Sequence, residues 1–246
     1  MRRMFSEKQI LELVKNTTGK DTVDKVLIYN PDAIGQIYYE KYREKIFSPL
    51  DGVTHLTVPF ITMYPPKTPV CFGTMFTGAT PQVHGITKYE KPVITIDSLF
   101  DCWARAGKKV ALISNAKQSI PRIFANRNID YYYPENDEAV IEKALELLRN
   151  SDYDVIEVYN QEYDDFLHVT HPRSYFCKRA SKRYVARYLR LIEQAKESWK
   201  DYSFLTTFSP DHGAHRILKI LIGTHGKNIP EDMNIVHFFS CFNKNN

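Results

Sequence analysis

The sequence predicts a single α/β domain over residues 1–246, a three-layer α/β/α fold in which the central sheet is mostly parallel. Strand-like and helix-like segments alternate along the chain, which is typical of parallel strands connected by helices. Several strand-like segments are short and continuously apolar, as strands buried on both faces are. The composition, 43% hydrophobic and 25% charged with 10 Gly and 13 Pro, excludes a disordered or fibrous chain.

Seven segments are rich in the β-branched and aromatic residues that favour strands, and turn-forming residues flank them. In chain order, we expect strands over 25–29, 54–58, 109–114, 130–133, 153–159, 202–208 and 234–239. The three tyrosines at 131–133 could form a stacking surface for a ligand, but the proline that follows favours a strand end.

Helices are expected between the strands, over 7–15, 98–106, 138–149 and 174–200. Ser6 with Gln9 resembles a capping box for the first helix, and Asp97 can cap the second, which ends before Gly107. The last helix combines an apolar stripe with basic and aromatic residues. A basic face exposed to solvent is favoured over a nucleic-acid site, so we expect no specific nucleic-acid partner.

Charge and cysteine content restrict the class of protein. The net charge of +4 is too small to indicate nucleic-acid binding. No apolar run reaches the roughly 18 residues that span a bilayer, and the start of the sequence lacks a secretory signal, so we expect a cytoplasmic location and no membrane partner. The four cysteines are widely spaced and predict reduced thiols.

Acidic residues and histidines recur where strands are expected to end. Asp164 and His168 follow the strand at 153–159 with the i, i+4 spacing of one helical face. Asp211 and His212 follow the strand at 202–208. Ligands of open α/β sheets bind beyond the carboxyl ends of the strands. The alternatives are an exposed acid–histidine pair and a simple turn closed by Gly213.

Two more fragments extend this pattern. His225 lies between Gly223 and Gly226, and Asp32 lies just beyond the first strand. Imidazole and carboxylate groups are the usual ligands of Zn²⁺ and, in harder ligand sets, of Mn²⁺ or Fe²⁺. Together the four fragments predict a metal centre.

Thr68 is a candidate nucleophile. A proline-rich loop leads into an apolar helical segment, with Thr68 expected at the N-cap and Pro69 at the first helical position. A hydroxyl there faces free backbone N–H groups and the positive end of the helix dipole, which suits a phosphate. Capping alone is the alternative role.

In this order the fragments resemble the alkaline phosphatase superfamily, most closely a compact protein of its nucleotide pyrophosphatase/phosphodiesterase branch. The resemblance covers nearly the whole chain. It is carried by residues 26–32, 67–68, 77–86, 164 with 168, 211–213 and 223–226. It implies an alkaline-phosphatase-like fold without a large cap insertion, because only a short segment separates His212 from His225.

The resemblance also implies two divalent metal ions, with Zn²⁺ favoured and Mn²⁺ or Fe²⁺ as alternatives. Asp164, His168 and His225 would hold one ion. Asp32, Asp211 and His212 would hold the other, with Thr68 as its fourth ligand and as the attacking group. Lys67 and Cys71 are the candidate substrate-binding residues, although the branch often has Asn where this chain has Cys71. His84 matches an architectural position, and His171 is interpreted as a surface residue.

The implied function is the hydrolysis of a small phosphate ester, either a monoester or a diester. Binding to a dication can ionise a threonine hydroxyl, which is otherwise neutral at physiological pH. Attack on phosphorus then gives a phospho-threonine, and its hydrolysis leaves the configuration at phosphorus retained. A phosphomutase or phosphotransferase with the same core is one alternative, and a metal-binding regulatory protein without activity is the other.

Overall fold

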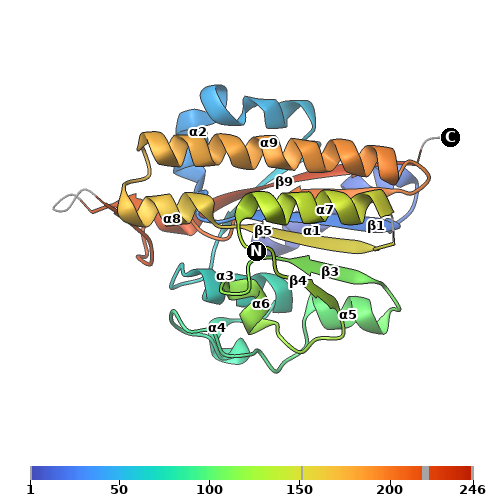
Figure 1. Ribbon diagram of the computed structural model, residues 1–246, viewed down its shortest axis with the longest axis horizontal. Coiled ribbons are helices and arrows are strands. Elements are labelled where there is room, and N and C mark those ends of the chain that lie inside the picture. The colour runs from blue at the N-terminus through green and yellow to red at the C-terminus, as the bar shows by residue number, and fades with distance from the viewer. Residues whose placement is uncertain (1, 151, 218–221, 245–246) are drawn as a thin grey trace.

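The computed structural model describes residues 2–150, 152–217 and 222–244 (Figure 1). Its main feature is a seven-stranded sheet with the spatial order β2-β9-β6-β1-β5-β3-β4. The strands of this sheet are β1 (Lys25–Pro31), β2 (Leu56–Ile61), β3 (Val110–Ile113), β4 (Asp130–Tyr132), β5 (Val155–Asn160), β6 (Phe204–Phe208) and β9 (Asn234–Phe242). A separate two-stranded hairpin consists of β7 (His215–Arg216) and β8 (Gly223–Thr224).

The sheet is mostly parallel, as predicted. β1 lies at its centre and pairs in parallel with β5 on one side and β6 on the other. β3 pairs in parallel with β5 and β4. β9 runs antiparallel to both of its neighbours, β2 and β6. The carboxyl ends of β6, β1 and β5 therefore lie side by side, which is where a ligand site is expected in such a sheet.

Helices connect the strands. The α-helices are α1 (Arg2–Thr18), α2 (Gln36–Tyr42), α3 (Thr68–Thr77), α4 (Pro81–His84), α5 (Leu99–Arg105), α6 (Ser119–Ile123), α7 (Asp137–Asn150), α8 (Glu162–Val169), α9 (Tyr175–Ser198) and α10 (Pro230–Met233). A π-helical turn, η1 (Arg43–Phe47), and a 3₁₀ turn, η2 (Ser48–Gly52), follow α2. None of the described helices is both long and apolar enough to cross a membrane.

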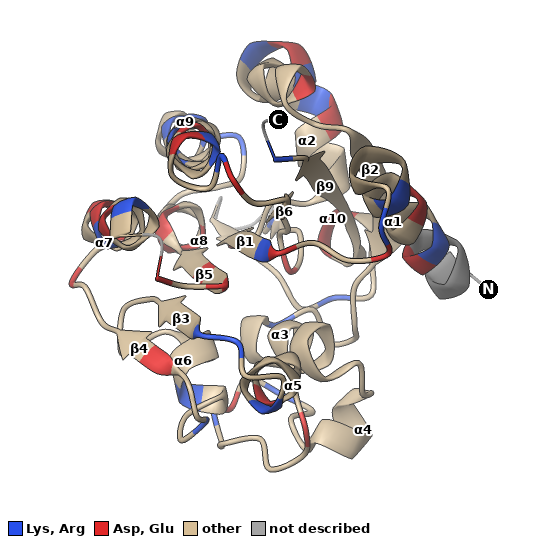
Figure 2. Ribbon diagram, turned by 90° about the vertical axis from the view of Figure 1, so that its right-hand side faces the viewer, with Lys and Arg blue, Asp and Glu red and all other residues tan. Residues whose placement is uncertain are grey.

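Helices cover both faces of the sheet, which confirms the three-layer prediction (Figure 2). One apolar cluster joins β1, β5 and β6 to α2, α7, α8 and α9. The other joins β3 and β5 to α3, α5 and α6. Because both faces of the central strands are buried, their continuous apolar runs are the sequence signal that located them.

Several predicted boundaries were wrong by a few residues. The first helix begins at Arg2, so Ser6 lies inside it and is not its N-cap. Ser98, not Asp97, caps α5, where its side chain and that of Asp101 form a capping box. β2 begins two residues later than expected and extends to Ile61. The tyrosine-rich segment ends strand β4, as predicted.

The basic face of α9 is exposed at Arg179, Lys182 and Arg190, as we expected, but Arg187 is an exception. Arg187 is buried and lies within 3.6 Å of three carboxylates, those of Asp137, Glu138 and Glu162. Arg183 and Arg190, on the same helix, pair with acidic residues of α8 and α7. These arginines therefore join α9 to its neighbouring helices.

Candidate metal centre

Asp32 lies directly after β1 and is fully buried. Its backbone N–H donates to the carbonyl oxygen of Asn160 at the end of β5, which holds the two strand ends together. The hydroxyl of Tyr159 donates to Asp32 Oδ2. Ala33, the next residue, has φ 64° and donates its backbone N–H to Asp211 Oδ1. This tight turn fixes both carboxylates at the carboxyl edge of the sheet.

Asp164 and His168 lie one helical turn apart on α8, as the spacing predicts. His168 Nε2 is 3.3 Å from Asp164 Oδ2, and His225 Nε2 is 3.6 Å from Asp164 Oδ1. Gly223 packs directly on α8, because a Cβ there would lie 2.2 Å from Leu167 Cδ1. The glycine thus permits the close approach that brings His225 to the helix.

Asp211 and His212 are fully buried in the loop that leaves β6. His212 Nε2 lies 3.4 Å from Asp211 Oδ2 and 3.5 Å from Asp32 Oδ1. The next residue, Gly213, packs against the backbone of Glu231. A Cβ at Gly213 would lie 2.0 Å from the carbonyl oxygen of Glu231. The motif therefore needs glycine at this position for packing.

The structure places these six predicted ligand residues in two compact groups. Within each group the candidate ligand atoms lie within 4.8 Å of one another. The rings of His212 and His225, one from each group, stack with their centroids 3.9 Å apart. The first group consists of Asp164, His168 and His225, and the second of Asp32, Asp211 and His212.

Two carboxylates of this centre, those of Asp32 and Asp211, are difficult to ionise without a compensating charge. Burial raises the pKa of Asp32 well above its usual range, and the charges of Asp211 and Asp164 raise it further. Burial also raises the pKa of Asp211 to about 8. A cation between such carboxylates would remove this penalty, since it offsets both desolvation and mutual repulsion.

The two buried imidazoles are neutral at physiological pH. Burial lowers the pKa of His212 well below its usual range, and the neighbouring His225 lowers it further. Burial also lowers the pKa of His225, although the Asp164 carboxylate opposes that shift. His168 differs, because its hydrogen bond with Asp164 raises its pKa. The neutral imidazole is the form that binds a metal.

The hydrogen bonds around the centre fit a pair of metal ions. Asp32 Oδ1, Asp164 Oδ1 and Asp211 Oδ2 are buried and lack a hydrogen-bond partner among the described residues. His212 Nδ1 donates to the carbonyl oxygen of Gly213, and His225 Nδ1 donates to that of Pro66. Since these bonds place the proton on Nδ1, each Nε2 directs a lone pair into its group, as in known metal sites, and that of His212 can accept from the Thr68 hydroxyl.

Thr68 lies at this centre, at the first position of α3. Its Oγ1 is 3.2 Å from His212 Nε2 and 3.5 Å from Asp32 Oδ2. The predicted cap position was wrong by one residue, because the N-cap is Lys67. Both partners of the Thr68 hydroxyl therefore belong to the metal centre.

The two predicted substrate-binding residues lie in different surroundings. Lys67 Nζ donates to the carbonyl oxygen of His225, and its stem passes Gly226, where φ is +117° and a Cβ would lie 2.6 Å from Lys67 Cε. This places a cation beside the centre. Cys71 is buried, and its thiol lies 3.9 Å from the carbonyl oxygen of Met63, so a contact between Cys71 and substrate stays a prediction.

Histidines outside the two groups have structural contacts. His84 packs under α3, where a Cβ on Gly73 would be 2.7 Å from its ring. His215 Nδ1 pairs with the buried carboxylate of Asp232. His237 Nε2 donates to the carbonyl oxygen of Pro210. His171 is partly exposed and belongs to neither ligand group.

Sequence reasoning missed Tyr159, whose hydroxyl reaches both Asp32 and Gln161. In sequence this residue is one of several aromatic and apolar side chains of β5, and only its place near the end of that strand distinguishes it. It also missed Tyr89, an exposed residue whose pKa is raised mainly by burial of its hydroxyl and further by the Asp32 and Asp164 carboxylates.

No protein-family model and no curated protein sequence matches the chain. Solved structures do match. Murine ectonucleotide pyrophosphatase/phosphodiesterase 5 is 15% identical with a TM-score of 0.68, over 89% of this chain and 88% of that one. The C-terminal periplasmic domain of phosphoethanolamine transferase EptC from Campylobacter jejuni is 14% identical with a TM-score of 0.61, over 93% and 82%.

A third match is phosphonoacetate hydrolase from Sinorhizobium meliloti 1021, 14% identical with a TM-score of 0.55, over 77% of this chain and 56% of that one. At these identities the likeness establishes the fold alone. All three proteins are members of one superfamily. The chain therefore has the fold of the alkaline phosphatase superfamily, as the order of its sequence motifs implies.

Proposed function

We propose that this protein is a metal-dependent hydrolase of phosphate esters that acts through Thr68. The observation that carries the proposal is the Thr68 hydroxyl, which lies beside two adjacent groups of metal-ligand residues. The fold supports it, because the matched structures are named as a phosphodiesterase, a phosphoethanolamine transferase and a phosphonoacetate hydrolase. The murine phosphodiesterase was also solved with AMP, and an EptC domain with Zn.

In this proposal, Asp164, His168 and His225 hold one divalent cation, and Asp32, Asp211, His212 and Thr68 hold a second. Zn²⁺ is our first choice, with Mn²⁺ and Fe²⁺ as alternatives, because the donors are nitrogen and carboxylate oxygen. When bound, the cations would supply Lewis acidity at the nucleophile and at the phosphate oxygens.

The residues of the chain have separate roles. The Thr68 hydroxyl loses its proton to solvent, and its oxygen attacks phosphorus as the bond from phosphorus to the leaving alcohol breaks. The alcohol leaves with a proton from solvent. Water then attacks the phospho-threonine, the bond from phosphorus to Thr68 Oγ breaks, and phosphate or a phosphomonoester is released. Two inversions give net retention at phosphorus. Lys67 adds positive charge beside the incoming phosphate.

The test is turnover of bis-p-nitrophenyl phosphate and of p-nitrophenyl phosphate by metal-loaded protein. Thr68→Ala should lower kcat by at least about a thousandfold, since it removes the nucleophile. Thr57→Ala, on the exposed side of edge strand β2, is the matched control and should retain the wild-type rate. If Thr68→Ala retains wild-type turnover, Thr68 is not the nucleophile.

A phosphotransferase is the second candidate, since one matched structure is a phosphoethanolamine transferase. The two functions differ in the acceptor. With glycerol as a competing acceptor, a hydrolase releases mainly inorganic phosphate from a monoester or a phosphomonoester from a diester, whereas a transferase forms mainly the glycerol ester. We also propose a cytoplasmic location, which the four free cysteines support. One matched structure, the EptC domain, is periplasmic, so cell fractionation is the test of the proposed cytoplasmic location.

A further inference from the structure

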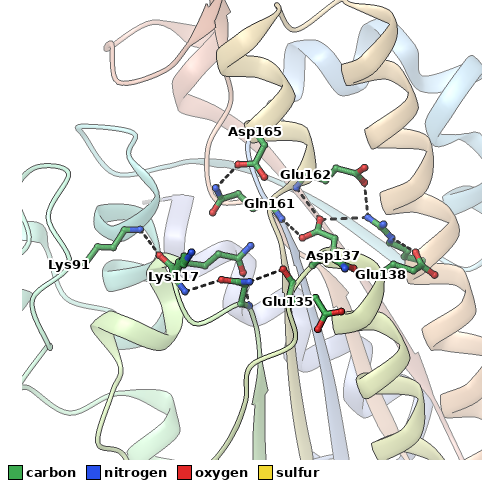
Figure 3. A pocket seen from close by; sticks show the side chains of 12 residues that line it. Lys91, Lys117, Glu135, Asp137, Glu138, Gln161, Glu162 and Asp165 are labelled. Atoms are coloured by element: carbon green, nitrogen blue, oxygen red, sulfur yellow. Dashed lines mark hydrogen bonds and ion pairs between the residues drawn. The ribbon is translucent and has the colours of Figure 1, made fainter.

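A polar cavity lies at the same edge of the sheet as the metal centre (Figure 3). Its volume is about 630 Å³, enough for a six-membered ring with its substituents. Three of its lining residues come shortly after the carboxyl ends of strands. Asn115 follows β3, Glu135 follows β4 and Gln161 follows β5. The last of these strands also carries Tyr159, which contacts the metal centre.

Hydrogen bonds connect this cavity to the metal centre. The Tyr159 hydroxyl, which donates to Asp32, lies 3.3 Å from Gln161 Oε1. Gln161 Nε2 donates to Asp165 Oδ1, and Asp165 is the neighbour of the ligand residue Asp164 (Figure 3). The pKa of Lys91, another lining residue, is lowered by burial, and the nearby Asp32 carboxylate opposes this shift. The cavity is thus adjacent to the place where phosphorus would be held.

All twelve side chains that line the cavity are polar or charged. No aromatic ring among them could stack on a nucleobase, and no apolar wall could hold an acyl chain. Three of the carboxylates, those of Asp137, Glu138 and Glu162, already pair with arginines of α9. The other charged residues, apart from Arg187 itself, are two lysines and two acids, namely Lys91, Lys117, Glu135 and Asp165. Because their charges balance, the cavity suits an uncharged ligand.

Two of these groups are free to bind a ligand. Within the described part of the chain, neither the Lys117 ammonium nor the Glu135 carboxylate takes part in a hydrogen bond or ion pair. One can only donate and the other can only accept. A hydroxyl group does both, and neighbouring hydroxyls on one ring can satisfy donor and acceptor groups together.

We propose that this cavity binds the alcohol part of the substrate, and that this alcohol is an uncharged polyol of sugar or cyclitol size. The proposal rests on the proposed function, because it assumes a phosphate ester at the metal centre. It adds the substrate class to that function: a phosphorylated polyol, rather than a nucleotide or a phospholipid with its chain in this cavity.

The test compares two esters that differ only in their hydroxyl groups, myo-inositol 1-phosphate and cyclohexyl phosphate. Each is assayed as the monoester and as its p-nitrophenyl diester, so that either kind of esterase gives a result. We expect kcat/KM to favour the inositol ester by at least about tenfold, the factor that one charge-assisted hydrogen bond contributes. A p-nitrophenyl ester of thymidine 5′-phosphate should be a poorer substrate than the inositol diester.

Variants then assign the preference to the cavity. The double variant Lys117→Met with Glu135→Leu changes two exposed side chains, so it should fold. It should reduce the inositol-to-cyclohexyl ratio of kcat/KM to below about threefold. Lys200→Met, an exposed substitution outside the cavity, should leave the ratio unchanged. Saturation-transfer NMR on Thr68→Ala protein should show contacts with myo-inositol and weaker ones with cyclohexanol, independently of turnover.

The results separate this proposal from the proposed function. Equal or better use of the cyclohexyl ester overturns the polyol proposal while the hydrolase remains. A preference for the thymidine ester, or an unchanged ratio in the double variant, overturns it as well. If no ester is cleaved, including p-nitrophenyl phosphate and bis-p-nitrophenyl phosphate, the proposed function fails, and NMR without a myo-inositol contact then overturns the cavity proposal separately.

Discussion

Asp211→Asn should stabilise the metal-free protein while it weakens metal binding. The side chain is fully buried, and its Oδ2 has no hydrogen-bond partner among the described residues. Asparagine keeps the shape and the Oδ1 that accepts from the Ala33 backbone N–H. Its new amide can donate to His212 Nε2, which lies 3.4 Å from the replaced oxygen. The substitution thus replaces a buried ionisable group with a neutral one at little cost in packing.

The pKa of Asp211 gives the size of the effect. Burial raises it from 3.8 to about 8, so between these values the folded protein holds a proton that the unfolded chain releases. Stability therefore falls as pH rises through this window, by about 1.4 kcal/mol per unit. The free energy of unfolding of the wild-type protein should therefore be lower than that of Asp211→Asn by up to about 4 kcal/mol at pH 7, but by only about 2 kcal/mol at pH 5.

The assay is urea unfolding in EDTA at pH 5 and pH 7, with Asp201→Asn on the exposed surface as the control. At pH 7, Zn²⁺ at a hundred times its dissociation constant should reduce this difference in stability, because it stabilises the wild-type fold by about 2.7 kcal/mol. The reasoning is refuted if Asp211→Asn is no more stable than wild type in EDTA at pH 7, or if the difference is the same at both pH values.

Three more substitutions test the surrounding structure. Burial raises the pKa of Glu157 from 4.5 to about 8. As pH rises between these values, the wild-type protein should therefore lose stability relative to Glu157→Gln. A difference in urea unfolding that does not depend on pH would contradict this. Gly213→Ala should destabilise the fold by about 3 kcal/mol, because its Cβ would meet the Glu231 backbone. Gly52→Ala, where a Cβ has open space, should leave the stability unchanged. Equal melting temperatures of the two variants would refute the contact. Arg187→Met should cost about 3 to 5 kcal/mol, since it leaves three carboxylates without their shared cation, and a loss below 1 kcal/mol in urea unfolding would be inconsistent with this role.

The sequence predicts the strands better than their directions and the short helices. β1, β5 and β6 have apolar runs that only a doubly covered strand needs, and each was found within about two residues. The antiparallel direction of β9 was not predicted, because a buried strand has the same composition in either direction. α4 and α10 are one turn long, too short to show helical periodicity.

The candidate ligand residues were identifiable because acids and histidines are unusual at the ends of buried strands. The resemblance to the alkaline phosphatase superfamily then implied their division into two groups, and the same two groups are found in the structure. The cavity could not be found in this way. Lys117 and Glu135 come from loops after different strands, and single charged residues in loops are common. Only the sheet order, with β3 between β4 and β5, brings them together.

The most direct test of the metal centre is the number of tightly bound ions per chain, measured by elemental analysis after loading and gel filtration. We expect about two ions in the wild-type protein, one for each ligand group, and about one in His225→Ala, which breaks only the first group. Thr57→Ala should bind the same number as wild type. A wild-type protein that retains no ion, or a His225→Ala variant that still retains two, would contradict the assignment of two adjacent metal sites.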